Sequence, residues 1–121
     1  MPRGFGYLMI VEAATFLVAS LLHLTVEWEP GAAGPEALIG VVMAVGAFFA
    51  LRGRRAVALW TSGFAAFGTV VGITAISSGP GPKSVPDLTY HGLILTTLIV
   101  SIVLMARTRP RRVPPSVTPN A

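Results

Sequence analysis

The chain of 121 residues contains no cysteine and few charged residues. The absence of cysteine excludes disulfides, iron–sulfur clusters, thiolate metal sites and cysteine nucleophiles. Charged residues make up 12% of the sequence, whereas soluble domains carry roughly 25%. Hydrophobic residues make up 53%. This composition is typical of a membrane protein.

The motifs of common enzymes and nucleotide-binding proteins are also missing. The sequence has no GxSxG, P-loop, GxGxxG or HExxH pattern, and it therefore favours a binding or accessory role over an enzyme. The net charge of +4 does not indicate nucleic-acid binding. Basic residues lie only between and beyond the apolar segments, whereas a nucleic-acid binder needs them spread over one folded face.

Long apolar segments are what the sequence does have. They predict four transmembrane helices, at about 5–26, 35–51, 56–77 and 87–106. Each reaches or approaches the length that crosses a bilayer core of about 30 Å. Because short links make consecutive helices antiparallel, we predict an all-α fold, an up-down-up-down four-transmembrane-helix bundle. Residues 1–106 form this domain, and residues 107–121 are predicted to be a disordered basic tail.

The distribution of charge predicts the orientation of these helices. Of nine basic residues, eight fall on one side of a four-pass arrangement and only Lys83 on the other. Cytoplasmic loops of membrane proteins carry the excess of Lys and Arg. Both termini are therefore expected in the cytoplasm of a bacterial cell, with the chain in the plasma membrane and the basic tail against the anionic inner leaflet.

Two ionisable residues interrupt the first apolar segment, and they are the first candidates for function. Glu12 and His23 lie within the membrane region, where ionisable groups are costly and mark functional sites by default. They share one helix face but lie eleven residues apart, about 16 Å along the axis. His91 lies one turn into the fourth segment, at a depth similar to that of His23.

These positions predict an outward-facing pocket between the first and fourth helices. Its candidate ligand- or metal-binding residues are His23, His91, Glu27, Glu36, Asp87 and Tyr90. Two imidazoles with carboxylates fit a divalent metal, the two histidines fit the axial ligands of a haem b, and the set as a whole fits a quinone or other amphipathic ligand. The simpler alternative is that the polar groups only hydrogen-bond one another and tie the helices together.

Glu12 has two interpretations of its own. It is expected to be neutral at rest, because desolvation disfavours the charged carboxylate, and it then serves either as a proton-carrying group or as a structural hydrogen-bonding residue. For the structural role, the sequence offers hydroxyl partners on the third helix at Thr61, Ser62 or Thr69.

Small residues predict where the helices pack closely. Gly40, Gly68 and Gly72 follow the small-xxx-small pattern of tightly packed membrane helices. If the polar residues are structural, the chain is instead a non-catalytic accessory subunit of a larger membrane complex, such as a respiratory or transport complex, or a homo-oligomer. In that case the third helix, with Gly63, Gly68 and Gly72, is the candidate docking face.

One segment carries a resemblance. The sequence PGPKSVPDLTYH follows a glycine-rich third helix, and a glutamate and a histidine occur in the first helix. In these features the chain resembles small bacterial four-helix integral membrane proteins of uncharacterised function. The resemblance covers nearly the whole apolar part of the chain and implies the same four-helix fold, but it assigns no activity to any residue.

Overall fold

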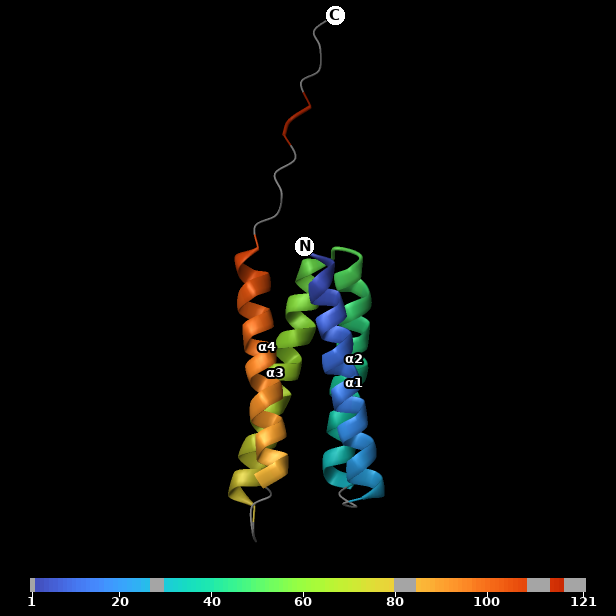
Figure 1. Cartoon of the computed structure of the whole chain (residues 1–121), viewed down its shortest axis with the longest axis vertical. Helices are drawn as coiled ribbons and strands as arrows, with labels where there is room; N and C mark the ends of the chain where they lie inside the picture. Colours follow the sequence, from blue (N-terminus) through green and yellow to red (C-terminus); the bar gives the residue numbers. More distant parts are fainter. Residues whose placement is uncertain (1, 27–29, 80–84, 109–113, 117–121) are drawn as a thin grey trace, which may run out of the picture.

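The computed structural model describes residues 2–26, 30–79, 85–108 and 114–116. It contains four helices, which lie side by side along the long axis of the molecule (Figure 1). Their bounds are Arg3–Thr25 for α1, Pro30–Leu51 for α2, Arg55–Ser78 for α3 and Val85–Arg107 for α4. All four are long and apolar enough to cross a membrane. The prediction of an all-α chain with four such helices is confirmed.

All four helices begin earlier than the sequence predicted, α1 by two residues and α3 by one. Helix α2 begins at Pro30 rather than Pro35, and α4 begins at Val85, so that Pro86 lies in its first turn. Proline is well suited to the first turn of a helix, where its missing N–H has no partner to lose. That rule applies at Pro30, whereas Pro35 lies inside α2 and removes one helical hydrogen bond.

The predicted tail begins one residue later than expected, because Arg107 completes α4. Within the described part of the tail, Thr108 and residues 114–116 have no regular secondary structure. Residues 109–113 and 117–121 lie outside the described ranges. The disorder of the tail stays a prediction.

The turn between α2 and α3 depends on a glycine. Gly53 has a φ angle of 78°, in the left-handed region that side chains with a Cβ rarely adopt. The N–H of Gly53 donates to the carbonyl of Ala50, and that of Arg54 donates to the carbonyl of Phe49. These bonds end α2 and let α3 start at Arg55 directly after the turn.

Close packing between consecutive helices occurs at glycines. A side chain on Gly6 of α1 would collide with Leu51 at the end of α2, and one on Gly46 of α2 would collide with Thr61 near the start of α3. Helix α1 packs along α2, α2 along α3 and α3 along α4, whereas α1 and α4 approach one another at few positions. At these two glycines, the start of α1 meets the end of α2, and the later part of α2 meets the early part of α3.

The predicted packing glycines all lie at helix contacts. Gly40 packs against Leu17 of α1, Gly68 against Ile39 of α2, and Gly72 against His91 of α4. Between the helices, the largest fully buried apolar side chains are Met9, Phe16, Met43, Leu98 and Met105. The close approach at glycines is what brings side chains of different helices into one core.

A matched pair of substitutions tests this packing. Gly46→Ala is expected to lower the free energy of unfolding by about 1–3 kcal/mol, because the new methyl group overlaps Thr61 and Met9. Gly63→Ala is the control: its Cβ would meet no atom within 4 Å, so the variant is expected to gain up to about 1 kcal/mol from helix propensity. Unfolding in mild detergent, followed by circular dichroism, measures both. Equal effects of the two substitutions would contradict the packing role.

Candidate functional site

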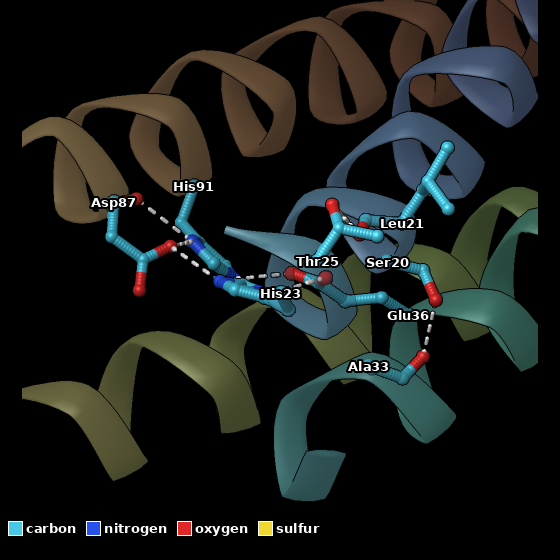
Figure 2. A network of polar contacts seen from close by, with 8 residues as sticks. All are labelled: Ser20, Leu21, His23, Thr25, Ala33, Glu36, Asp87 and His91. Atoms are coloured by element: carbon cyan, nitrogen blue, oxygen red, sulfur yellow. Dashed lines mark hydrogen bonds and ion pairs between the residues drawn. The ribbon is translucent and has the colours of Figure 1, made fainter. Parts of the chain in front are cut away.

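Four of the predicted site residues meet where α1 ends and α2 and α4 begin. His23 lies in the last turn of α1, Glu36 near the start of α2, Asp87 in the first turn of α4, and His91 one turn later. Figure 2 shows their side chains pointing toward one another from three helices. All four are largely removed from solvent, with side-chain exposures of 6%, 7%, 12% and 7% in that order. Glu27, the other carboxylate of the predicted set, lies outside the described residues.

The four side chains form a ring in which imidazoles and carboxylates alternate. Nδ1 of His23 and Oε2 of Glu36 share a hydrogen bond of 2.8 Å. Nε2 of His91 lies 3.7 Å from Oε1 of Glu36. On the other side, Oδ1 of Asp87 lies 3.1 Å from Nδ1 of His91 and 3.9 Å from Nε2 of His23. Each imidazole therefore faces two carboxylates, and each carboxylate faces two imidazoles. We call this set the His–carboxylate ring.

The hydrogen bonds define the tautomer of His91. Its Nδ1 lies 2.8 Å from the main-chain carbonyl oxygen of Asp87 and 3.1 Å from the carboxylate of the same residue. A carbonyl and an ionised carboxylate only accept hydrogen bonds, so Nδ1 of His91 carries the proton and donates it. This places Nε2 of His91 toward Glu36 and fixes the orientation of the imidazole.

Helix α3, the one helix that contributes no side chain to the His–carboxylate ring, supplies space for it instead. A Cβ on Gly72 of α3 would lie 3.2 Å from Nε2 of His91, closer than an ordinary contact. The missing side chain is what lets the imidazole reach Glu36. Nearby, the hydroxyl of Ser20 donates a hydrogen bond of 2.7 Å to the carbonyl of Ala33, which ties α1 to the first turn of α2 (Figure 2).

A groove opens beside the ring, between α1 and α4. Its volume is about 620 Å³. Its polar end is formed by His23, Asp87 and Tyr90. The remaining lining is mostly apolar and consists of Ile10, Val11, Ala14, Thr15, Val18, Ala19, Leu22 and Pro86. Glu36 and His91 do not line the groove but lie behind it, in contact with His23 and Asp87.

Tyr90 stands out at the polar end of the groove. Its hydroxyl oxygen is buried and has no hydrogen-bond partner among the described residues. The neighbouring His91 ring packs edge-on against its aromatic ring, with centroids 5.2 Å apart. A buried hydroxyl without a partner loses the free energy of a hydrogen bond. The hydroxyl of Tyr90 therefore has an unused hydrogen-bonding capacity within the described residues.

The ring has the composition of a metal site but a different geometry. Within the described residues, no group of three His, Asp or Glu side chains is arranged to hold a metal ion. The two imidazoles that would bind a haem each face carboxylates rather than one shared position. The arrangement is suited to holding imidazole and carboxylate groups in place, and to exchanging protons between them.

Glu12 lies outside this site, as the sequence spacing predicted. Its side chain is buried in the core, and neither carboxyl oxygen has a hydrogen-bond partner among the described residues. The suggested partners on α3 do not bind it. Thr61 and Thr69 donate to carbonyls of their own helix, and Ser62 is buried without a hydrogen bond. A threonine hydroxyl in a helix reaches the carbonyl one turn back, which is why these two side chains bond locally.

Sequence reasoning placed a pocket between the first and fourth helices, but it missed the long apolar wall of the groove and the role of Gly72 beside His91. The predicted set placed six residues in one pocket, whereas the structure divides the described ones between the groove wall and the ring behind it. The small side chains of Ala14 and Ala19 make room for the groove. They carried no signal because alanine is common on every face of these helices.

The contact between His23 and Glu36 is expected to couple α1 to α2 energetically. Each of the substitutions His23→Ala and Glu36→Gln leaves a buried partner unmatched, and each is expected to cost about 3–5 kcal/mol of unfolding free energy. The double variant is expected to cost less than the sum of the two, because the shared contact is lost only once. Denaturant titrations of the purified protein measure these values.

The control for this cycle is Thr25→Ala, because the exposed Thr25 hydroxyl donates only to the carbonyl of Leu21 in its own helix. This variant is expected to change stability little. Additive costs for His23→Ala and Glu36→Gln would show that the two side chains do not interact.

Comparisons with known proteins add no further assignment. No protein-family model, curated protein or solved structure matches this chain. The roles proposed below for the ring and the groove accordingly rest on contacts within the chain.

Proposed function

We propose that this protein binds a small amphipathic ligand in the groove between α1 and α4. The observation that carries the proposal is the groove itself, which joins a long apolar wall to a polar end made of His23, Asp87 and Tyr90. Ligand sites combine such apolar surface with a few convergent polar groups. The buried hydroxyl of Tyr90 supplies a donor for the polar head of the ligand.

The dimensions of the groove indicate the kind of ligand. From Ile10 to His23 the wall of α1 extends over thirteen residues, about 20 Å along the helix axis. A molecule with an apolar chain and one hydrogen-bond-accepting head matches this length and polarity. A quinone is such a molecule. A metal ion, another candidate for these residues, makes no use of the apolar wall. The two imidazoles do not face one shared position, as the two axial ligands of a haem b would.

The His–carboxylate ring supports the polar end of the groove. Glu36 is hydrogen-bonded to Nδ1 of His23, and Nδ1 of His91 contacts the carboxylate of Asp87. Side chains fixed in this way lose little further freedom when a ligand binds, which favours affinity. We therefore assign Glu36 and His91 as positioning residues, and His23, Asp87 and Tyr90 as residues that contact the ligand.

The proposal includes an orientation in the membrane. Eight of the nine basic residues lie at the termini or between α2 and α3, whereas Glu36 and Asp87 lie near the opposite helix ends. The positive-inside rule then places both termini in the cytoplasm of a bacterial cell and the ring near the outer surface of the plasma membrane. Contacts that join opposite ends of consecutive helices support an up-down-up-down order.

Binding of a decyl-substituted benzoquinone tests the proposal. Bound ligand is expected to raise the thermal unfolding midpoint of the detergent-solubilised protein, by an amount that grows with the logarithm of the ligand concentration divided by Kd. Tyr90→Phe removes one hydrogen bond and is expected to weaken binding by roughly threefold to tenfold. Ala14→Leu fills the groove and is expected to abolish the shift. Ala44→Leu, at an exposed position of α2, is the matched control and is expected to bind as the wild type does.

The same preparation distinguishes the other ligands. A haem absorption band, or a stoichiometric metal, that is lost in both His23→Ala and His91→Ala would refute the amphipathic ligand and support a cofactor at the ring. If neither a cofactor nor the benzoquinone binds, and both histidine variants fold normally, the binding proposal fails.

An accessory role in a larger membrane complex is the second candidate, and one observation favours it. Helix α3 carries an exposed aromatic face, with Trp60 81% and Phe67 69% exposed. Beside Gly63 this face contains a hollow of about 420 Å³. Gly68 and Gly72 face the interior instead and do not belong to it. We call this hollow the α3 notch; it is lined by Leu59, Trp60, Gly63, Phe64 and Phe67. Its shape fits a helix of another membrane protein.

If the protein is an accessory subunit, Gly63→Leu is expected to release it from the complex by filling this notch. The measurement is the size of the particle in gentle detergent extracts of the native membrane. Gly92→Leu is the matched control, because Gly92 is an exposed glycine of α4 whose Cβ would likewise meet no atom within 4 Å. A particle of single-chain size for the wild type would refute this role.

A further inference from the structure

Glu12 is an acid without a counter-charge in the middle of the bundle. Its side chain is 2% exposed, and neither of its oxygens has a hydrogen-bond partner among the described residues. Residues 8–22, 37–51, 56–78 and 92–106, which make up the middle of the four helices, contain no other titratable side chain. An ionised carboxylate in this position would be buried without compensation, which costs several kcal/mol at least.

The groups beside Glu12 accept hydrogen bonds rather than donate them. Thr97 and Ser101 of α4 lie beside its carboxyl, and neither hydroxyl donates a hydrogen bond to it. The Thr97 hydroxyl donates to the carbonyl of Ile94, and the Ser101 hydroxyl donates to the carbonyl of Thr97. A hydroxyl has only one hydrogen, so both side chains offer lone pairs to Glu12. An ionised carboxylate also only accepts, so it would receive a hydrogen bond from these neighbours only if one of them gave up its bond to a main-chain carbonyl.

A third hydroxyl lies near this level of the bundle, and unlike those of Thr97 and Ser101 it has no hydrogen-bond partner among the described residues. Ser62 of α3 is fully buried and has no hydrogen bond among the described residues. Met9, one turn before Glu12, and Thr61, next to Ser62, both pack against Gly46. Ser62 therefore lies within about one helical turn of the level of Glu12. Polar groups from three helices gather at a depth where the rest of the core is apolar.

We propose that Glu12 is a proton-binding site in the core of the membrane. Its carboxyl group holds a proton, and the resulting O–H donates to the hydroxyl oxygen of Ser101 or Thr97. A proton is a suitable occupant of this site, because the O–H group that it forms on Glu12 needs only one hydrogen-bond acceptor. A hard metal cation takes about six oxygen ligands, more than the two carboxyl and two hydroxyl oxygens of Glu12, Thr97 and Ser101.

This site is independent of the proposed ligand groove. Eleven residues, about 16 Å along α1, separate Glu12 from His23. Glu12 does not line the groove, whose wall on α1 includes its neighbour Val11 instead. Failure of ligand binding would leave the proton site untouched, and the reverse also holds.

Infrared spectroscopy of the protein in lipid bilayers at neutral pH tests the proposal. The wild type is expected to show the carbonyl stretching band of a protonated carboxylic acid, and this band is expected to be lost in Glu12→Gln. Glu29→Gln is the matched control, because it removes a carboxyl between α1 and α2 in the sequence and is expected to leave the band in place. The double variant Thr97→Val with Ser101→Ala keeps Glu12 but removes its acceptors, and it is expected to shift the band.

Two results would overturn the proposal. If the difference spectrum between wild type and Glu12→Gln contains the bands of an ionised carboxylate, Glu12 carries a charge. If those bands change with sodium concentration at constant pH, a metal cation rather than a proton occupies the site. Glutamine has the shape of a protonated glutamic acid, so Glu12→Gln is expected to fold. Should it not fold, the wild-type band and its shift in the Thr97 and Ser101 variant decide the question.

Discussion

The pairing of imidazoles with carboxylates where α1 ends is the interaction on which the rest of the site depends. Glu36 and Asp87 are held away from water, where an unpaired carboxylate is costly. His23 and His91 compensate both, and they do so from different helices. Because α1 and α4 approach one another at few positions, this ring is also the main polar link between them. It fixes the polar end of the groove while leaving the apolar wall below it open.

The chain handles its buried acids in two ways. At the ring, each carboxylate has imidazoles on two sides, which supply polar partners inside the protein. At Glu12 the hydroxyls of Thr97 and Ser101 donate to main-chain carbonyls, and under our proposal a bound proton removes the charge of the acid. The difference follows from depth: imidazoles occur only near one end of the bundle, and the middle of every helix lacks them.

The remaining surface fits a membrane environment. Many large apolar side chains are exposed on all four helices, which would drive aggregation in water but is compatible with lipid. On this apolar surface, the groove and the α3 notch differ in the polarity of the residues that line them. The groove combines apolar wall with polar end, as a ligand site requires. The notch beside Gly63 is lined by aromatic and aliphatic residues only, as a helix contact requires.

The sequence by itself determined how many helices form, roughly where they lie, and at what depth each polar residue sits, because apolar length and helical rise are local properties. It thus separated Glu12 from His23 and brought His23 level with His91. It misplaced the start of α2, because Pro30 and Pro35 fit a first turn equally well by sequence. Only the tertiary structure decided that imidazoles face carboxylates rather than one another, that Gly72 makes room for His91, and that a groove opens beside Tyr90. These features depend on the rotation and spacing of helices, which are set by side chains that meet from distant parts of the chain.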